Sequence, residues 1–70
     1  MLVKDFLEKF RDQDCRGIYI SDFIHLIDTF YYSSNMVEKV IDKYGDYEIE
    51  SFHISIYNYE EPFLSLNIFL

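Results

Sequence analysis

The last third of the chain alternates apolar and polar residues more regularly than any other part, and this alternation limits the available folds. Every second residue from Leu64 to Leu70 is apolar, and a period of two places such residues on one face of a β-strand. The same period runs through Phe52, Ile54 and Ile56. Because turn-forming residues 58–62 separate the two runs, the pattern predicts an antiparallel hairpin with one buried apolar face.

Upstream of this hairpin, Tyr47 and Ile49 also alternate with acidic residues, but in the opposite phase. One face can hold both runs only if the strand contains an extra residue, so we expect a β-bulge near Ser51–Phe52. The other face of the hairpin would then carry polar and aromatic side chains, namely those of His53, Ser55, Tyr57, Ser65, Asn67 and Phe69.

Two segments have the period of an amphipathic helix. The first has apolar residues at positions 3, 6, 7 and 10, which predicts about two and a half helical turns followed by a loop over residues 12–17. The second has apolar residues at positions 37, 40, 41 and 44. Asn35 followed by Glu38 resembles a capping box at its start, and Gly45 fits a left-handed residue at its end.

Residues 22–32 are ambiguous, because their apolar positions fit a helical stripe and a β-strand equally well. If they form a strand, Ser21-Asp22-Phe23 is the turn of a hairpin with Ile18–Ile20. We favour the strand, since it supplies partners for the terminal hairpin. The expected fold is therefore a single α+β domain over residues 1–70, with two short helices packed on a mainly antiparallel sheet in the order α-β-β-α-β-β.

The amino-acid composition favours some classes of function and disfavours others. Thirteen acidic and six basic residues give a net charge of −7, which disfavours nucleic acid and anionic lipid as direct ligands. Aromatic residues make up 20% of the chain, which favours a partner surface or a homodimer. The lone Cys15 favours a reducing compartment. Because no secretory signal and no apolar run of about 20 residues is present, we expect a cytoplasmic protein.

Residues that could carry chemistry are few. Cys15, His25 and His53 are the candidate nucleophile and bases, but their spacing matches no catalytic or zinc motif. The two glycines lie too far apart to form a phosphate-binding loop. We therefore expect a protein that is not an enzyme and that has no catalytic residues, no metal and no cofactor.

The distribution of charge suggests a binding surface instead. All six basic residues lie at or before Lys43, whereas the chain from Tyr44 onward contains five acids and no base. Carboxylates next to exposed rings suit a basic protein partner, although such acids also keep an aromatic-rich protein soluble. The predicted partner-binding residues are Asp46, Tyr47, Glu48, Glu50, Tyr57, Tyr59, Glu60 and Glu61.

The segments VKDFLEKF and DKYGDYEIESF, followed by a short closing apolar strand, resemble small acidic proteins of phages and mobile elements of Gram-positive bacteria. Several classes of such proteins inhibit host defence, and anti-CRISPR proteins are among them. The resemblance implies a phage-encoded inhibitor acting in the host cytoplasm. The charge distribution favours one that occupies the basic groove of a nucleic-acid-handling protein. The alternative is a structural or assembly module that acts as a homodimer or accessory subunit through its aromatic surface.

Overall fold

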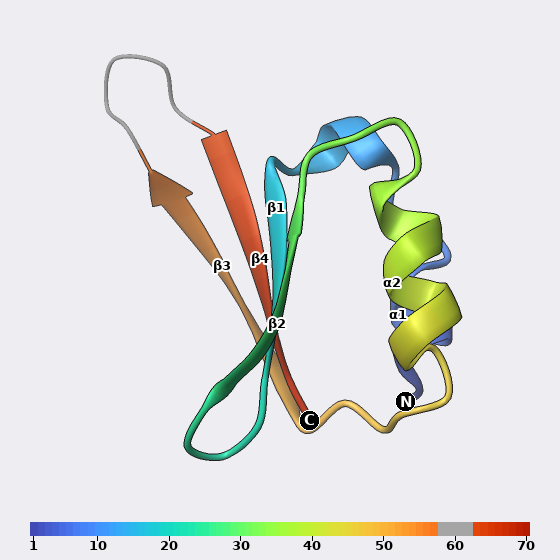
Figure 1. The fold of residues 1–70 in the computed structure, drawn as a ribbon, viewed down its shortest axis with the longest axis vertical. Coiled ribbons are helices and arrows are strands. Elements are labelled where there is room, and N and C mark those ends of the chain that lie inside the picture. The colour runs from blue at the N-terminus through green and yellow to red at the C-terminus, as the bar shows by residue number, and fades with distance from the viewer. Residues whose placement is uncertain (58–62) are drawn as a thin grey trace.

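The structure is a computed structural model, and it describes residues 1–57 and 63–70, without the side chains of Tyr57 and Phe63. The described residues form an α+β fold (Figure 1), which confirms the predicted class and order. Residues 26–31 are a strand, so the ambiguous stretch is not a helix. The elements are α1 (Val3–Leu7), the 3-10 helix η1 (Asp12–Asp14), β1 (Gly17–Ser21), β2 (Leu26–Tyr31), α2 (Met36–Tyr44), β3 (Ser51–Tyr57) and β4 (Phe63–Phe69).

The four described strands form one mixed sheet in the order β2-β1-β4-β3. Two antiparallel hairpins, β1–β2 and β3–β4, meet at the centre, where β1 and β4 run parallel. Parallel neighbours require a long crossover, and the chain between β1 and β4 supplies it with β2, α2 and β3. The strands β2 and β3 are therefore the two edges of the sheet.

Both helices lie on the same side of the sheet (Figure 1). Their apolar stripes pack against the central strands, as the helical periods predict. In the described part of the chain, no helix is long and apolar enough to cross a membrane. The core consists of Val3, Leu7, Cys15, Ile18, Ile20, Met36, Val37, Val40, Tyr44, Leu66 and Ile68.

The first helix is shorter than its apolar period predicts, because it ends at Leu7 rather than continuing to Phe10. The Asp14 carboxylate accepts a hydrogen bond from the Arg11 backbone N–H at 2.8 Å. This bond gives the backbone an alternative to the helical ladder, so the predicted loop over residues 12–17 begins with the turn of η1. The Phe10 ring still lies 5.2 Å from the Phe6 ring.

Both predicted caps of α2 are wrong. Asn35 precedes the helix but makes no side-chain capping bond, and Gly45 is right-handed, with φ −56° and ψ −31°. The N–H of Gly45 donates to the Ile41 carbonyl at 2.8 Å, and its own carbonyl accepts a bond from the Lys4 N–H at 3.0 Å. These two bonds hold Gly45 in a helical conformation, so no left-handed residue is needed there.

The predicted bulge near Ser51–Phe52 is also wrong. The strands β3 and β4 pair one to one from Ser51–Phe69 to Tyr57–Phe63. The preceding segment, residues 46–50, forms an isolated bridge between Glu48 and Leu2 and meets the sheet where the Glu50 N–H donates to the Phe69 carbonyl at 2.8 Å. The phase of the apolar pattern changes because this segment is not part of the strand. An irregularity in register is present instead in the other hairpin, between Ile20 and Ser21.

Candidate functional site

The helix-facing side of the terminal hairpin carries apolar side chains that remain exposed. We call this surface the hairpin strip: Phe52 is 53% exposed, Ile54 47%, Ile56 66% and Leu64 40%. Ile54 pairs with Leu66, which is only 1% exposed. The boundary of the core therefore runs between β4 and β3. The predicted burial of the apolar face is correct for Leu66 and Ile68 of β4 and wrong for Leu64 and β3.

Short helices explain why the hairpin strip is exposed. The helix α2 lies toward β2, where the Tyr44 ring meets the Phe30 ring edge-on at 6.1 Å. The helix α1 reaches β3 only near its start, where the Phe6 ring lies 4.8 Å from the Phe52 ring. Helices of five and nine residues extend only about 7 and 14 Å. They are too short to cover a sheet whose longest strands extend about 20 Å.

The exposure of the hairpin strip could have been predicted from the sequence, although not from the apolar period alone. The period identifies which face of a strand is apolar, but not whether another element covers that face. The combined length of the two predicted helices, compared with the area of four strands, would have indicated incomplete cover. Sequence reasoning therefore missed the four residues of the hairpin strip as candidate contact residues.

A second exposed apolar cluster lies at the turn between β1 and β2. The Asp22 carboxylate accepts bonds from the N–H groups of Ile24, at 2.9 Å, and His25, at 2.7 Å. These bonds define the conformation of the turn and direct its apolar side chains into solvent. We call this surface the tip cluster, and it consists of Phe23, Ile24, Leu26 and Ile27.

The opposite face of the hairpin has the polar character expected from the sequence. His53 pairs with Asn67, and Ser55 pairs with Ser65. The Asn67 amide donates to the His53 carbonyl at 3.3 Å and to the Ser55 hydroxyl at 3.4 Å. Ser65 is 1% exposed, and its hydroxyl has no hydrogen-bond partner among the described residues. The backbone register thus places the described members of the predicted polar face together.

The acidic segment before β3 is partly neutralised by the chain's own cations. Asp46 forms an ion pair with Lys4 at 3.1 Å, and Glu48 pairs with the amino terminus at 2.9 Å. Both pairs are exposed, so they contribute little to stability. Glu50 is exposed, and none of the described cations lies within ion-pair distance of it. Of the predicted contact acids that the structure describes, Glu50 therefore has the freest charge.

The predicted tyrosine anchors are not all placed by the structure. The Tyr47 side chain is 54% exposed, and its ring lies 5.6 Å from the Tyr44 ring. The Tyr57 backbone ends β3, about 20 Å along the strand from Ser51. The segment 46–50 and Tyr57 thus lie at opposite ends of β3. Tyr59, Glu60, Glu61 and the side chain of Tyr57 lie outside the described residues.

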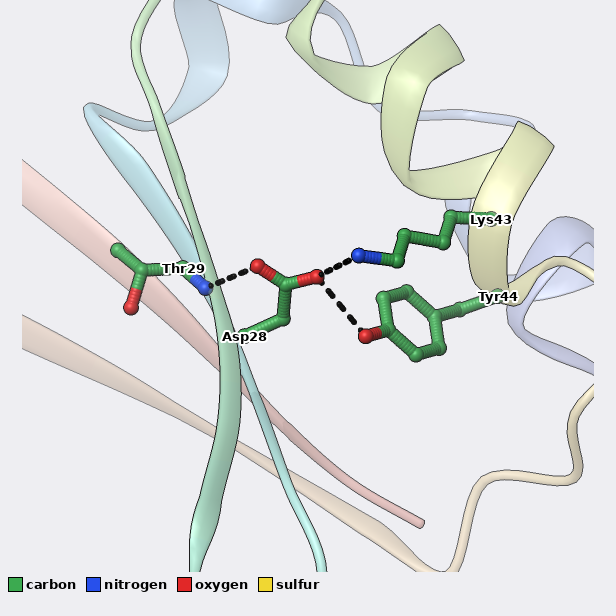
Figure 2. Close-up of polar contacts among 4 residues, drawn as sticks. All are labelled: Asp28, Thr29, Lys43 and Tyr44. Atoms are coloured by element: carbon green, nitrogen blue, oxygen red, sulfur yellow. Dashed lines mark hydrogen bonds and ion pairs between the residues drawn. The ribbon is translucent and has the colours of Figure 1, made fainter.

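A carboxylate cluster joins β2 to α2 (Figure 2). The Asp28 carboxylate accepts hydrogen bonds from Lys43 Nζ at 2.7 Å, from the Tyr44 hydroxyl at 2.8 Å and from the Thr29 N–H at 2.8 Å. The bond from Lys43, followed by that from Tyr44, lowers the pKa of Asp28 from its ordinary value. A carboxylate with three donors is a weak proton acceptor, so the cluster acts as a structural clamp.

The candidate catalytic residues are not brought together. Cys15 is 6% exposed, and burial is the main reason that the pKa of its thiol is raised. His25 lies in the β1–β2 turn, 3.9 Å from Asp22, and His53 lies on β3. Within residues 1–57 and 63–70, no group of three or more histidine, cysteine or acidic side chains could hold a metal ion.

A groove of about 540 Å³ lies between α1, η1 and the start of α2. Its buried walls are apolar, whereas the charged side chains around it are exposed, except for the half-buried Asp12. The groove is lined by Leu7, Glu8, Phe10, Arg11, Asp12, Gln13, Ser34, Asn35, Val37, Glu38 and Ile41. Its size is within the range of small-molecule sites.

The fold and its surfaces define a small α+β domain with one half-covered sheet. Comparison with known proteins adds no relative: no family model matches the chain, and neither the curated proteins nor the solved structures contain a match.

Proposed function

We propose that this chain is a non-enzymatic protein-binding module that contacts its partner through the hairpin strip. The observation that carries the proposal is the exposure of four large apolar side chains on one face of a regular hairpin. Contiguous exposed apolar surface on a small domain is typical of interaction sites. Rigid aromatic and aliphatic side chains are also effective anchors, because they lose little entropy on binding.

The partner that we propose has an apolar patch with basic residues near it. The net charge of −7 raises the association rate with a basic protein through long-range attraction. Glu50 directly precedes β3, so its exposed carboxylate lies at the beginning of the hairpin strip. A nucleic-acid-handling protein is a common source of such a basic surface. The resemblance to small acidic phage proteins further supports an inhibitor of a host protein of this class.

A pull-down with paired variants tests the contact surface. The variant Ile56→Ser with Leu64→Ser removes two members of the hairpin strip, and Phe23→Ser with Ile24→Ser removes two members of the tip cluster, which are more exposed. A partner captured from host lysate is identified by mass spectrometry and then titrated in purified form. We expect the strip variant to bind at least about tenfold more weakly, while the tip variant binds like wild type. Unchanged affinity of the strip variant would reject the proposed surface.

A second pair of variants tests the charge. The variant Glu50→Lys places a cation beside the hairpin strip, whereas Glu38→Lys makes the same change on the exposed face of α2. We expect Glu50→Lys to slow association more than Glu38→Lys, and the difference to shrink between about 0.05 and 0.5 M salt. Equal effects of the two substitutions would indicate that only net charge matters.

A further inference from the structure

The two edges of the sheet differ in how they are protected against pairing with another chain. Any edge strand presents unpaired N–H and C=O groups, and proteins block such edges with bulges, charges or proline. The edge strand β2 has two of these features, because its register shifts opposite Ile20–Ser21 and because Asp28 is an inward-pointing charge held by Lys43.

The other edge strand, β3, has none of these protective features. Its seven residues, SFHISIY, contain no charged residue and no proline. Its register with β4 is continuous over the whole strand. Its apolar residues Phe52, Ile54 and Ile56 are about half exposed or more. A regular, neutral and apolar edge of this length is a template for strand addition.

The sequence of β3 is self-complementary about its middle residue, Ile54. In an antiparallel pair of two β3 strands centred there, Ile54 faces its own copy and Phe52 faces Ile56. These pairs lie on one face of the sheet, while His53 faces Ser55 on the other. Aromatic and β-branched cross-strand pairs of this kind stabilise antiparallel sheets. A two-fold interface requires such self-complementarity, because each copy contributes the same surface.

We propose that two copies of this chain pair antiparallel through β3, with Ile54 at the two-fold axis. The pairing joins two four-stranded sheets into one sheet. The role that it gives to the hairpin strip in partner binding rests on the proposed function. Four half-exposed side chains form a small contact surface, whereas stable interfaces bury about 800 Å² on each partner. Pairing places the two hairpin strips side by side and doubles the apolar surface offered to the partner.

Sedimentation of the full chain over micromolar to roughly 0.1 mM concentrations tests the pairing. We expect a reversible monomer–dimer equilibrium that shifts toward the dimer as salt rises, because two chains of charge −7 repel each other. The variant Ile54→Lys places like charges opposite each other at the axis, and we expect at least about tenfold weaker association. The matched variant Leu26→Lys, on the other edge strand, should associate like wild type.

Mixing two charged variants tests whether position 54 faces itself. Ile54→Lys and Ile54→Glu should each be monomeric alone, and together they should form a mixed dimer, because opposite charges then meet at the axis. Circular dichroism of each variant confirms that the fold is retained. Failure of the mixture to associate, when wild type does, would overturn the proposed axis.

Disulfide formation tests the register. A cysteine introduced by Ile54→Cys would meet its copy at the 4.5–5.5 Å Cα separation of antiparallel pairs, roughly within disulfide range. A cysteine introduced by Ile56→Cys would lie about 13 Å from its copy, so only Ile54→Cys should cross-link on oxidation. Wild type, whose only thiol is the buried Cys15, is the control. Equal cross-linking of both variants would overturn the register.

Different results would overturn the β3 dimer and the proposed partner-binding surface. A wild-type chain that stays monomeric at every concentration and salt overturns the dimer, even if partner capture depends on the hairpin strip. If wild type forms the dimer but the variant Ile56→Ser with Leu64→Ser binds the partner with unchanged affinity, the pairing is supported and the proposed function is rejected.

Discussion

The Asp12 carboxylate accepts a hydrogen bond from the Val37 backbone N–H at 2.8 Å. The donor is one of the first N–H groups of α2, which lack partners within the helix. An acid of η1 thus caps a helix that begins 24 residues later in the chain, and it also places negative charge at the positive end of the helix dipole. The neighbouring Asn35 makes no side-chain capping bond.

The first prediction follows from this tertiary cap. Asp12→Ala should lower the free energy of unfolding by about 1 kcal/mol, which corresponds to a fall in Tm of roughly 4–8 °C for a domain of this size. Asn35→Ala should change Tm much less, because its side chain caps nothing. Thermal unfolding followed by circular dichroism measures both variants. A larger loss for Asn35→Ala than for Asp12→Ala would contradict the observed cap.

The second prediction concerns the acid stability that the Asp28 clamp confers. Its hydrogen bonds from Lys43 and Tyr44 lower the pKa of Asp28 in the folded protein. A lowered folded-state pKa stabilises the fold above the unfolded-state pKa of about 4, and this stabilisation is lost as the pH falls through the folded-state value. Asp28→Asn should therefore be less stable than wild type at pH 7, and the difference should shrink below about pH 4.

Urea unfolding from neutral pH to about pH 2 measures this effect. The variant Tyr44→Phe is the intermediate control, because it removes one donor to Asp28 and leaves the Lys43 bond in place. Its loss of stability at neutral pH should be smaller than that of Asp28→Asn. If wild type and Asp28→Asn differ by the same amount at every pH, the carboxylate does not contribute through its charge.

The third prediction distinguishes the two glycines. A Cβ atom on Gly45 would collide with the Ile41 carbonyl oxygen, which is backbone and cannot move aside cheaply. At Gly17 the nearest atoms would lie at 3.5 Å, an ordinary contact distance. Gly45→Ala should therefore cost about 1–3 kcal/mol, whereas Gly17→Ala should cost little. Chemical denaturation of both variants tests this, and equal stability of the two would contradict the close approach.

The fourth prediction concerns Cys15. Its thiol is buried, and burial raises its pKa, so the reactive thiolate is scarce at neutral pH. A colorimetric thiol reagent should modify the folded protein much more slowly than a small free thiol, and denaturant should restore the fast rate. Modification of the folded protein at the rate of a free thiol would show that Cys15 is accessible.

The existence and type of most elements could be predicted from the sequence, because local periods depend on neighbouring residues. The alternation after Phe52 predicts β3 and β4, and the stripe from Val37 to Tyr44 predicts α2. The early end of α1 follows from a local bond between Arg11 and Asp14, but at Gly45 and in residues 46–50 contacts distant in sequence contributed to the outcome. Gly45 is bonded to Lys4 and Ile41, and residues 46–50 follow the amino-terminal segment instead of extending β3.

The candidate site was accessible to sequence reasoning only in part. The acidic and aromatic composition indicated a binding protein, but the residues proposed for contact were chosen by charge. Asp46 and Glu48 instead pair with cations at the amino end of the chain. Because the partners of a charged side chain depend on the folded arrangement, spacing along the chain could not reveal these pairs.

By itself, the sequence determined the α+β class, the type and order of the elements outside residues 22–32, and which face of the terminal strands is apolar, because these follow from periods of 2 and 3.6 residues. Only the tertiary structure decided that β1 and β4 pair in parallel and that β3 is left at an unprotected edge. The physical reason is that the helices cover only part of the sheet. Two short helices can bury the centre of a four-stranded sheet, and the apolar side chains beyond their reach remain exposed to solvent.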